Sequence, residues 1–412
     1  MKILLLSWEY PPVVIGGLGR HVYHLATELA AAGHDVVVLS RQPAGTDPST
    51  HPTTDEVHEG VRVIAAAQDP HEFTFGTAMM AWTLAMGHAM IRAGLSLRAH
   101  GRPWRPDVVH AHDWLVAHPA IALAQFHSAP LVSTIHATEA GRHSGWLSGE
   151  VNRQVYAVES WLVRESDALI VCSRSMGAEI TELFGPDLAG ITVIRNGIDV
   201  ASWPFAKRRA HTGPAELLFV GRLEYEKGVH DAIAALPRIR RTHPGTTLTV
   251  AGEGTQQDWL IAQAREHRVL KAVRFAGHLG HQDLLEALHR TDVAVLPSHY
   301  EPFGLTALEA AAAGAPLVTS NVGGLGETVI NGKTGLSVPP RDIAALAGAV
   351  RSVLDDPAGA QRRARAARNR LTRDFAWRAV AAETAAVYAS ARRGPHPPLA
   401  RLSIPERALQ GR

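Results

Sequence analysis

Short apolar runs alternate with helical stretches along almost the whole chain, and no other feature of the sequence limits the fold as strongly. Strands that alternate with helices form parallel sheets, because each crossover carries its helix over one face of the sheet. The sequence therefore predicts an α/β fold with two doubly wound parallel sheets, one in each half of the chain. The runs that suit buried strands lie at 2–7, 36–39, 61–65, 107–110, 131–135, 168–172, 192–194, 217–220, 247–250, 273–275, 293–296 and 317–319.

The length of the chain favours two domains. With 412 residues, it exceeds the size that one hydrophobic core usually serves. Proline, lysine and arginine cluster between 196 and 214 without an apolar period, which is typical of a linker. We predict an N-terminal Rossmann-like domain at 1–200 and a C-terminal one at 201–374. A helix at about 375–393 is expected to pack back on the first domain, and 394–412 to be a flexible tail.

Composition excludes several classes of protein. Hydrophobic residues make up 46% and charged residues 19%, which is typical of a globular chain. The formal net charge of +2 gives no reason to expect a nucleic-acid partner. The single cysteine, Cys172, excludes an internal disulfide framework and fits a reducing compartment. The first apolar run is too short for a signal peptide, and no run reaches the length of a membrane span, so we expect a cytoplasmic protein.

The residues from 293 to 320 read as a strand, a loop, an alanine-rich helix and a second strand. Glu301 lies in the loop, and Glu309 lies in the helix, which is apolar on nearly every side and is therefore expected to be buried. A buried glutamate is costly unless it is hydrogen-bonded, and a ligand hydroxyl or a neighbouring arginine are both candidates. The loop-to-helix step at 303–305 presents free backbone N–H groups, where an anion would bind.

Two cations follow the first strand of the second half. Arg222 and Lys227 lie just before a predicted helix, where positive charge opposes the helix dipole. A diphosphate would resolve this conflict, with Arg222 forking onto its oxygens and Lys227 acting as a point charge. Local pairing with Glu224 and Glu226 is the alternative.

Three glycine-rich turns follow predicted strands. Gly16 and Gly17 precede the first predicted helix, without the spacing of the dinucleotide-binding fingerprint. The other two turns lie at 252–254 and 321–327, in the second half. Glycine lets the backbone approach a ligand closely, although each turn could also be a plain turn.

Histidine and aspartate follow two strands of the first half. One expected strand ends at His110 and is followed by His112 and Asp113, and His136 comes after the next strand. Open α/β sheets bind ligands beyond the carboxyl ends of their strands, so these side chains are candidates for a ligand site. The HAHD segment could also bind a metal, but no further ligand cluster is apparent in the sequence, and we expect no metal site.

These motifs resemble a known family. The spacing Glu301-x7-Glu309, with Arg222-x4-Lys227 upstream, is similar to that of retaining glycosyltransferases of the two-Rossmann GT-B type, in the family containing bacterial glycogen synthases and sucrose synthases. The resemblance covers nearly the whole chain. The segments WEYPPVVIGGLGRHV and STIHATEAGRHSGW resemble the branch that makes α-1,4-glucan for glycogen and methylglucose lipopolysaccharide. The remaining matches are the glycine loop at 16–18, HAHDW at 110–114, His136 and NGID at 196–199.

The resemblance implies a GT-B fold whose two domains face each other across a cleft. It also implies glucose transfer from UDP-glucose or ADP-glucose to an α-glucan, a maltooligosaccharide or a methylglucose-polysaccharide precursor, with retained anomeric configuration. No metal or other cofactor is implied, and a monomer and a dimer both remain open. One alternative is transfer of mannose to a lipid acceptor, with the basic residues 361–373 in weak contact with an anionic membrane instead of forming a solvated helix face. Another is a catalytically idle module that binds glucan or nucleotide.

The resemblance also implies roles for single residues. Arg222 and Lys227 would neutralise the leaving diphosphate, Glu309 would hold the ribose hydroxyls, and Glu301 would bond the hydroxyls of the donor sugar. His136 would lie against that sugar. The implied catalytic set is Glu301, Arg222, Lys227, His136 and Asp113. Further donor contacts are implied for Gly16, Gly17, Gly252, Glu253, His278, Leu279, Phe303, Gly304 and Leu305, and acceptor contacts for Asp113, Trp114 and Asn196.

One position departs from the family pattern. Bacterial glycogen synthases carry a Lys-x-Gly-Gly loop, whereas this chain has Val14 and Ile15 before Gly16 and Gly17. The cation of the loop is missing, which leaves open how the loop contacts the base and the phosphates of the donor.

Overall fold

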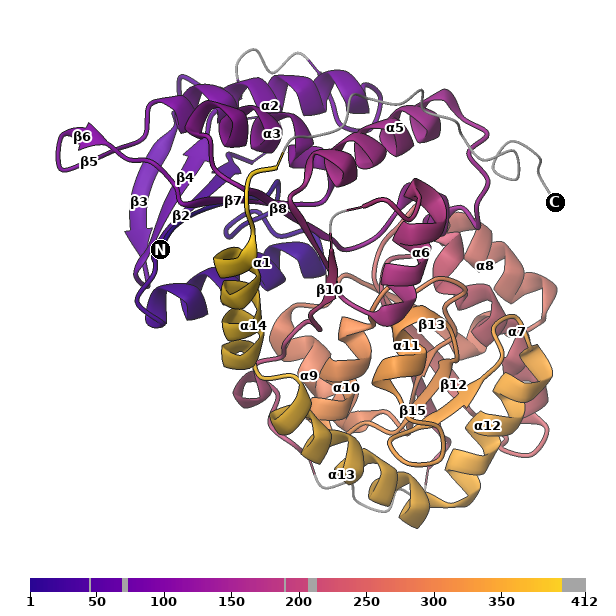
Figure 1. Cartoon of the computed structure of the whole chain (residues 1–412). Coiled ribbons are helices and arrows are strands. Elements are labelled where there is room, and N and C mark those ends of the chain that lie inside the picture. Colours follow the sequence, from indigo (N-terminus) through magenta and orange to yellow (C-terminus); the bar gives the residue numbers. More distant parts are fainter. Residues whose placement is uncertain (44–45, 69–72, 189, 207–212, 395–412) are drawn as a thin grey trace. The chain divides into compact units, whose positions relative to one another are not determined.

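The computed structural model in Figure 1 describes the chain except for 44–45, 69–72, 189, 207–212 and 395–412. The chain forms two compact units. One comprises Met1–Asn196 and the chain from Trp377 onward, and the other comprises Gly197–Ala376. These divisions lie close to the predicted boundaries at 200 and 374. The predicted tail lies almost entirely outside the described residues.

The N-terminal unit is built on an eight-stranded sheet in the order β10-β9-β8-β7-β1-β2-β4-β3. All neighbouring strands pair in parallel except β3, which pairs antiparallel with β4 at one edge. The central strands are buried along almost their whole length, as parallel strands covered on both faces require. The strands are β1 (Lys2–Leu6), β2 (Asp35–Arg41), β3 (Thr54–His58), β4 (Val61–Ala66), β7 (Val108–His112), β8 (Leu131–Ile135), β9 (Ala168–Val171) and β10 (Ile191–Val193).

Helices accompany this sheet, and a short hairpin, β5 (Arg98–Ala99) with β6 (Arg102–Pro103), lies outside it. The last helix of the chain packs against the first, and its Tyr388 hydroxyl lies 2.7 Å from Nδ1 of the buried His110. The first helix buries Val22, Leu25 and Leu29 on one face. The helices are α1 (Gly17–Ala31), α2 (Met79–Leu95), α3 (Ala117–His127), α4 (Glu139–Arg142), α5 (Glu150–Glu165), α6 (Arg174–Phe184) and α14 (Trp377–Ser390).

The C-terminal unit has a six-stranded sheet in the order β13-β12-β11-β14-β15-β16, with every pair parallel. The strands are β11 (Glu216–Val220), β12 (Thr247–Ala251), β13 (Val273–Gly277), β14 (Val293–Leu296), β15 (Leu317–Ser320) and β16 (Leu336–Val338). The helices are α7 (Val229–Arg240), α8 (Gln257–Glu266), α9 (His281–Arg290), α10 (Leu305–Ala313), α11 (Gly323–Thr328), α12 (Ile343–Asp355) and α13 (Pro357–Asp374).

The structure corrects several details of the sequence-based expectations. The polar stretch before 61 contains β3, whose mostly exposed residues lack the apolar run that marks a buried strand. The strand expected to end at His110 continues to His112. The segment 139–149, which no expected strand or helix covers, begins with the short helix α4, which the Thr138 side chain caps by accepting a hydrogen bond from the Gly141 N–H.

The basic residues 361–373 lie in α13, and two of their arginines serve the packing of this unit. Arg368 donates to the carbonyl oxygens of Trp203 and Ala312, at 2.6 Å each, and Arg370 donates to that of Thr328 at 2.6 Å. Arg373 lies on the exposed side, as a solvated face would predict. Among the residues that the structure describes, no helix combines the length and apolar character that a bilayer span requires.

Candidate active site

The strand order of the C-terminal sheet reverses between two neighbouring strands. The chain proceeds from β11 to β12 and β13 on one side, and β14 to β16 lie on the other. In open α/β sheets, ligands bind beyond the carboxyl ends of the strands at such a switch point. The loop after β11 carries Arg222 and Lys227, and the loop after β14 carries Glu301. The topology therefore brings three of the predicted catalytic residues to one place.

Both cations are held by carboxylates in this unit. Lys227 Nζ donates to Glu301 Oε2 at 2.8 Å, and both side chains are less than one-fifth exposed. Arg222 Nη2 donates to Glu226 Oε1 at 2.9 Å, while the arginine side chain remains half exposed. The alternative of local pairing therefore holds for Arg222, whereas Lys227 reaches across to the neighbouring loop. Lys227 was predicted to neutralise the leaving group, and Glu301 was predicted to bind the donor sugar. The ion pair places these two side chains next to each other.

The glycines after β12 serve close packing between loops. A Cβ atom on Gly252 would lie 1.9 Å from the carbonyl oxygen of Gly221, and one on Gly254 would lie 2.4 Å from that of Leu223. Between them, the carbonyl of Glu253 accepts a hydrogen bond from the Leu223 N–H at 2.8 Å. Only glycine fits these positions, because the backbones of the two loops touch. This packing fixes the backbone on either side of Arg222.

The third glycine turn packs in the same way against the Glu301 loop. A Cβ atom on Gly323 would lie 2.3 Å from the carbonyl oxygen of Glu301. His278 and Leu279, predicted to contact the donor, follow β13, which lies at the sheet edge two strands from β11. His278 and Leu279 are therefore two strands away from the Arg222 loop, whereas Gly252 and Glu253 are one strand away.

The helix that follows the Glu301 loop offers backbone donors at its start. Gly304 occupies the N-cap of α10 with a φ of 96°, and no side chain caps this end by a hydrogen bond. Leu305 begins the helix, Phe303 is buried just before it, and Glu309 lies on it with only 6% of its surface exposed. This end of α10 therefore presents the positive side of its dipole to an anion, as the sequence predicted.

The glycine loop of the N-terminal unit is held by a carboxylate that the sequence analysis missed. Glu9, which follows β1 and is almost fully buried, accepts hydrogen bonds through Oε2 from the N–H groups of Ile15 and Gly16, at 2.9 Å each. A Cβ atom on Gly16 would meet no atom within 4 Å, so space remains beside this residue. Gly17 starts α1. The only signal for Glu9 in the sequence was its place between a strand and a glycine turn.

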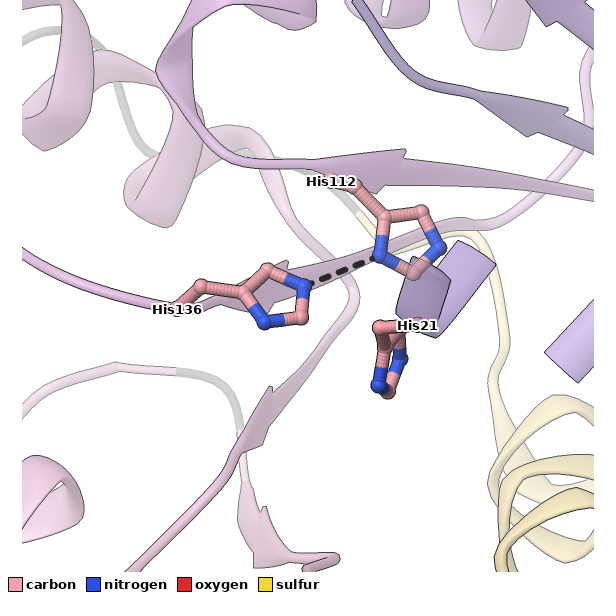
Figure 2. Close-up of side chains that lie close together, drawn as sticks. All are labelled: His21, His112 and His136. Carbon is pink, nitrogen blue, oxygen red and sulfur yellow. Dashed lines mark hydrogen bonds between the residues drawn. The ribbon is translucent and has the colours of Figure 1, made fainter. Parts of the chain in front are cut away.

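Three imidazoles gather at the carboxyl end of the N-terminal sheet (Figure 2). His112 ends β7, His136 follows β8, and His21 projects from α1. His112 Nδ1 and His136 Nε2 share a hydrogen bond of 3.1 Å. Burial lowers the pKa of His136 to about 3 and holds the pKa of His21 and His112 well below the usual range. All three rings are therefore neutral at pH 7.

The pKa of Asp113, which lies beside these rings, is also shifted. Asp113 has a φ of 62° and accepts a hydrogen bond from the His136 N–H through Oδ1 at 2.7 Å. Burial raises the pKa of Asp113 to about 6, and the bond from the His136 amide opposes this rise. Trp114 and Asn196 are both buried in this unit. The side chain of Asn196 opposes the lowering of the His21 pKa by burial. The structure thus brings His136 and Asp113 together, and Asn196 acts on His21, whose ring lies next to His136.

The HAHD segment divides into two roles. His110 lies 2.7 Å from the hydroxyls of Tyr388 and Thr134 through its two ring nitrogens, so it connects β7, β8 and α14 inside the unit. His112 instead faces His136. His21 was not selected from the sequence, because one histidine on the apolar face of a predicted helix resembles an ordinary core residue.

Comparison with known proteins identifies the family. The model for "Glycosyltransferase Family 4" matches 15–202, and the model for "Glycosyl transferases group 1" matches 204–370. The chain is 78% identical to a glycogen synthase from Mycobacterium tuberculosis over the full length of both proteins. It is 32% identical to a D-inositol 3-phosphate glycosyltransferase from Kineococcus radiotolerans, with 94% of each chain covered.

A solved structure agrees with these sequence matches. The sucrose-phosphate synthase from Thermosynechococcus elongatus matches with a TM-score of 0.79 and 26% identity, covering 94% of this chain and 98% of that one. The predicted resemblance and the predicted fold class are thereby confirmed. The chain is a glycosyltransferase and belongs to the GT-B family that the family 4 and group 1 models describe.

Proposed function

We propose that this chain is a retaining α-1,4-glucosyltransferase. It transfers glucose from a nucleotide diphosphate glucose, UDP- or ADP-glucose, to an α-glucan, a maltooligosaccharide or a methylglucose-polysaccharide precursor. The observation that carries the proposal is the Lys227–Glu301 pair at the switch point of the C-terminal sheet. The identity of 78% with a protein named glycogen synthase supports glucose as the transferred sugar.

Departure of the diphosphate needs positive charge that is already in place. Lys227 and Arg222 supply two cations, and the uncapped start of α10 adds the positive end of a helix dipole. Charge that is preorganised in this way is often the largest single contribution to catalysis. The reaction therefore requires no metal ion. Glu309, buried on α10, is assigned to the ribose hydroxyls of the donor.

The sugar is assigned to carboxylate and neutral imidazole contacts. Glu301 accepts hydrogen bonds from the sugar hydroxyls while its other contact, Lys227, stays with the phosphate. His136 offers a neutral ring, because its pKa of about 3 excludes the charged form at neutral pH. A neutral ring bonds a hydroxyl without competing for the diphosphate. Asp113, Trp114 and Asn196 are assigned to the sugar or acceptor side.

Retention follows from attack on the face that the phosphate leaves. The bond between the anomeric carbon and the diphosphate oxygen breaks while the acceptor hydroxyl oxygen bonds to that carbon on the same face. The hydroxyl proton passes to the departing phosphate oxygen. A carboxylate nucleophile would retain the configuration by another route, but Glu301 is already engaged with Lys227, so we assign it no such role.

A donor panel tests the proposal. The purified protein is incubated with UDP-glucose, ADP-glucose or GDP-mannose, with and without short maltooligosaccharides, in the presence and absence of a chelator. We expect one or both glucose donors to extend the acceptor by α-1,4-linked glucose, with no loss of rate in the chelator. Turnover of GDP-mannose alone would indicate a mannosyltransferase. A β-linked product would exclude retention, and no donor consumption under any condition would indicate an idle binding module.

A further inference from the structure

The imidazole cluster of the N-terminal unit, His21, His112 and His136, has the geometry of a transition-metal site. Each ring offers a nitrogen, and these three nitrogens lie within 4.8 Å of one another. The ring centroids are 4.7 Å apart for His21 and His136, and 5.5 Å apart for each of the other two pairs. Figure 2 shows the His112 and His136 rings facing each other, with the His21 ring beside them.

These separations agree with tetrahedral coordination. A Zn–N distance of about 2.0–2.1 Å places two ligand nitrogens about 3.3 Å apart and their ring centroids about 5 Å apart. The nitrogens of His112 and His136 that face each other are 3.1 Å apart. A metal between these rings would therefore require only small ring movements.

One ring nitrogen of the cluster lacks the hydrogen-bond partner that a buried polar atom usually has. His21 Nδ1 is buried and has no hydrogen-bond partner among the described residues, whereas His112 bonds His136 through Nδ1, the nitrogen that would face the metal. Buried polar atoms of this kind are rare and call for an explanation. Burial also keeps the rings neutral, which is the form that binds metals.

The residues around the cluster bear on three further needs of a metal site: ring orientation, access for the metal and proton balance. Asn196 interacts with His21 strongly enough to oppose the lowering of its pKa, and outer polar partners of this kind orient the rings of metal-bound histidines. His136 is only partly buried, so a metal has an approach from its side. Binding needs no net loss of protons. The hydrogen that bridges His112 and His136 moves to the other nitrogen of its own ring, and two lone pairs then face the metal.

We propose that His21, His112 and His136 bind a divalent transition metal, with Zn²⁺ the best fit, and that the bound metal inhibits the enzyme. Three imidazoles suit Zn²⁺, whereas Mg²⁺ and Ca²⁺ prefer oxygen ligands. The fourth coordination position is left for water. Inhibition rests on the proposed function, because it follows from withdrawing His136 from the donor sugar. Binding of the metal does not depend on that function.

Metal binding is tested on the full-length protein without an affinity tag, after treatment with a chelator. Zn²⁺ is titrated against a chromophoric chelator, and Co²⁺ is added separately to record its visible absorption. We expect one tight equivalent of Zn²⁺ and the intense absorption of tetrahedral Co²⁺. Replacing a ligand, in His21→Gln or His136→Gln, is expected to weaken binding by at least about tenfold.

The matched control is His24→Gln. His24 lies on the same helix and stacks on Trp377, which also contacts His21, but it is outside the cluster. It also controls for weak binding by histidines outside the cluster, because the chain has 23 histidines in all. We expect this variant to bind Zn²⁺ as the unmodified protein does. Thermal melting of each variant reports whether it is folded, and His136→Gln, at the partly exposed position, decides the result if His21→Gln does not fold.

Three results would overturn the proposal of a site: no tight equivalent in the unmodified protein, an octahedral Co²⁺ spectrum, or equal affinity in the His136→Gln and His24→Gln variants. Inhibition is measured separately, as glucosyl transfer with and without saturating Zn²⁺. Full transfer at saturation would overturn the inhibitory role. A protein that binds Zn²⁺ at the cluster but consumes no donor in metal-free buffer would retain the site and contradict the proposed function instead.

Discussion

In the C-terminal unit the loops after β11 and β14 carry charged side chains bonded in pairs, whereas in the N-terminal unit the ends of β7 and β8 carry neutral imidazoles. Lys227 pairs with Glu301, and Arg222 pairs with Glu226. His112 and His136 lie deep enough that burial removes their charge. Both groups occupy the carboxyl ends of parallel strands. Equivalent topology therefore carries two different sets of side chains, ion pairs in one unit and neutral imidazoles in the other.

The glycine loops of the two units also differ, in how closely other atoms approach the glycine. Gly252 in the C-terminal unit touches the backbone of the neighbouring loop, so its lack of a side chain serves the fold. Gly16 in the N-terminal unit has open space where a side chain would be, so its lack of a side chain leaves room beside the loop. The same residue type thus has a packing role in one unit, and in the other it leaves access to the backbone.

The largest expected effect on stability comes from replacing the packed glycine. Gly252→Ala should destabilise the protein by about 3–5 kcal/mol, because the new Cβ would lie 1.9 Å from the Gly221 carbonyl oxygen at a φ of +138°. Gly16→Ala should stay within about 1 kcal/mol, because its φ of −148° suits alanine and the space is open. Chemical denaturation of both variants measures the difference. Equal destabilisation would remove the contrast between the two loops.

A smaller effect is expected at the buried acid Glu159 on α5. Its Oε1 accepts a hydrogen bond from the Glu139 N–H at 2.9 Å, and burial raises the pKa of Glu159 well above its usual value. The native state therefore keeps a proton that the unfolded chain loses above its ordinary pKa, so Glu159 costs stability as the pH rises from about 4.5. Glu159→Gln keeps the acceptor and removes the charge.

The gain in unfolding free energy of Glu159→Gln over the unmodified protein should therefore be larger at pH 7 than at pH 4, by at least about 1 kcal/mol. Denaturation at the two pH values measures it. A gain that does not change with pH would mean that Glu159 ionises normally. Burial in the N-terminal unit would then not suppress charge at Glu159 as it does at His112 and His136.

The smallest effect is expected where Tyr388 of α14 contacts His110 of β7. Tyr388→Phe removes the hydroxyl that lies 2.7 Å from His110 Nδ1 and leaves a buried ring nitrogen without that partner, at a cost of about 1–2 kcal/mol. Tyr225→Phe, at an exposed tyrosine of the C-terminal unit, is the control and should change stability by less than about 0.5 kcal/mol. A Tyr388→Phe protein as stable as this control would show that the contact of the hydroxyl with His110 does not stabilise the unit.

Much of the fold could be predicted because buried parallel strands leave a simple pattern. Runs such as those of β1 and β14 are apolar on both faces, so the sequence marks them clearly. The exposed edge strand β3 and the three-residue β16 lack this pattern, and both were missed. The extension of β7 to His112 was also missed, because two histidines interrupt its apolar character.

The site could be predicted where a motif lies within one loop, and less well where it depends on contacts between distant segments. Arg222 and Lys227 are close in the sequence, but the contact of Lys227 with Glu301 spans 74 residues. His21, His112 and His136 come from three separate elements, and no spacing in the sequence brings them together. Glu9 was missed for a similar reason, since its role depends on how the glycine loop folds back onto it.

The most direct test of the account is the turnover of the Lys227→Ala and Arg222→Ala variants, with Lys333→Ala, at an exposed lysine of the same unit, as the control. Glucosyl transfer from the preferred donor at saturating concentrations gives kcat for each protein. If Lys227 stabilises the departing diphosphate, kcat of Lys227→Ala should fall by about 10²–10³ while the control stays near the unmodified rate. If Lys227→Ala and Arg222→Ala turned over as fast as the control, the charged loops of the C-terminal unit would have no part in the departure of the leaving group.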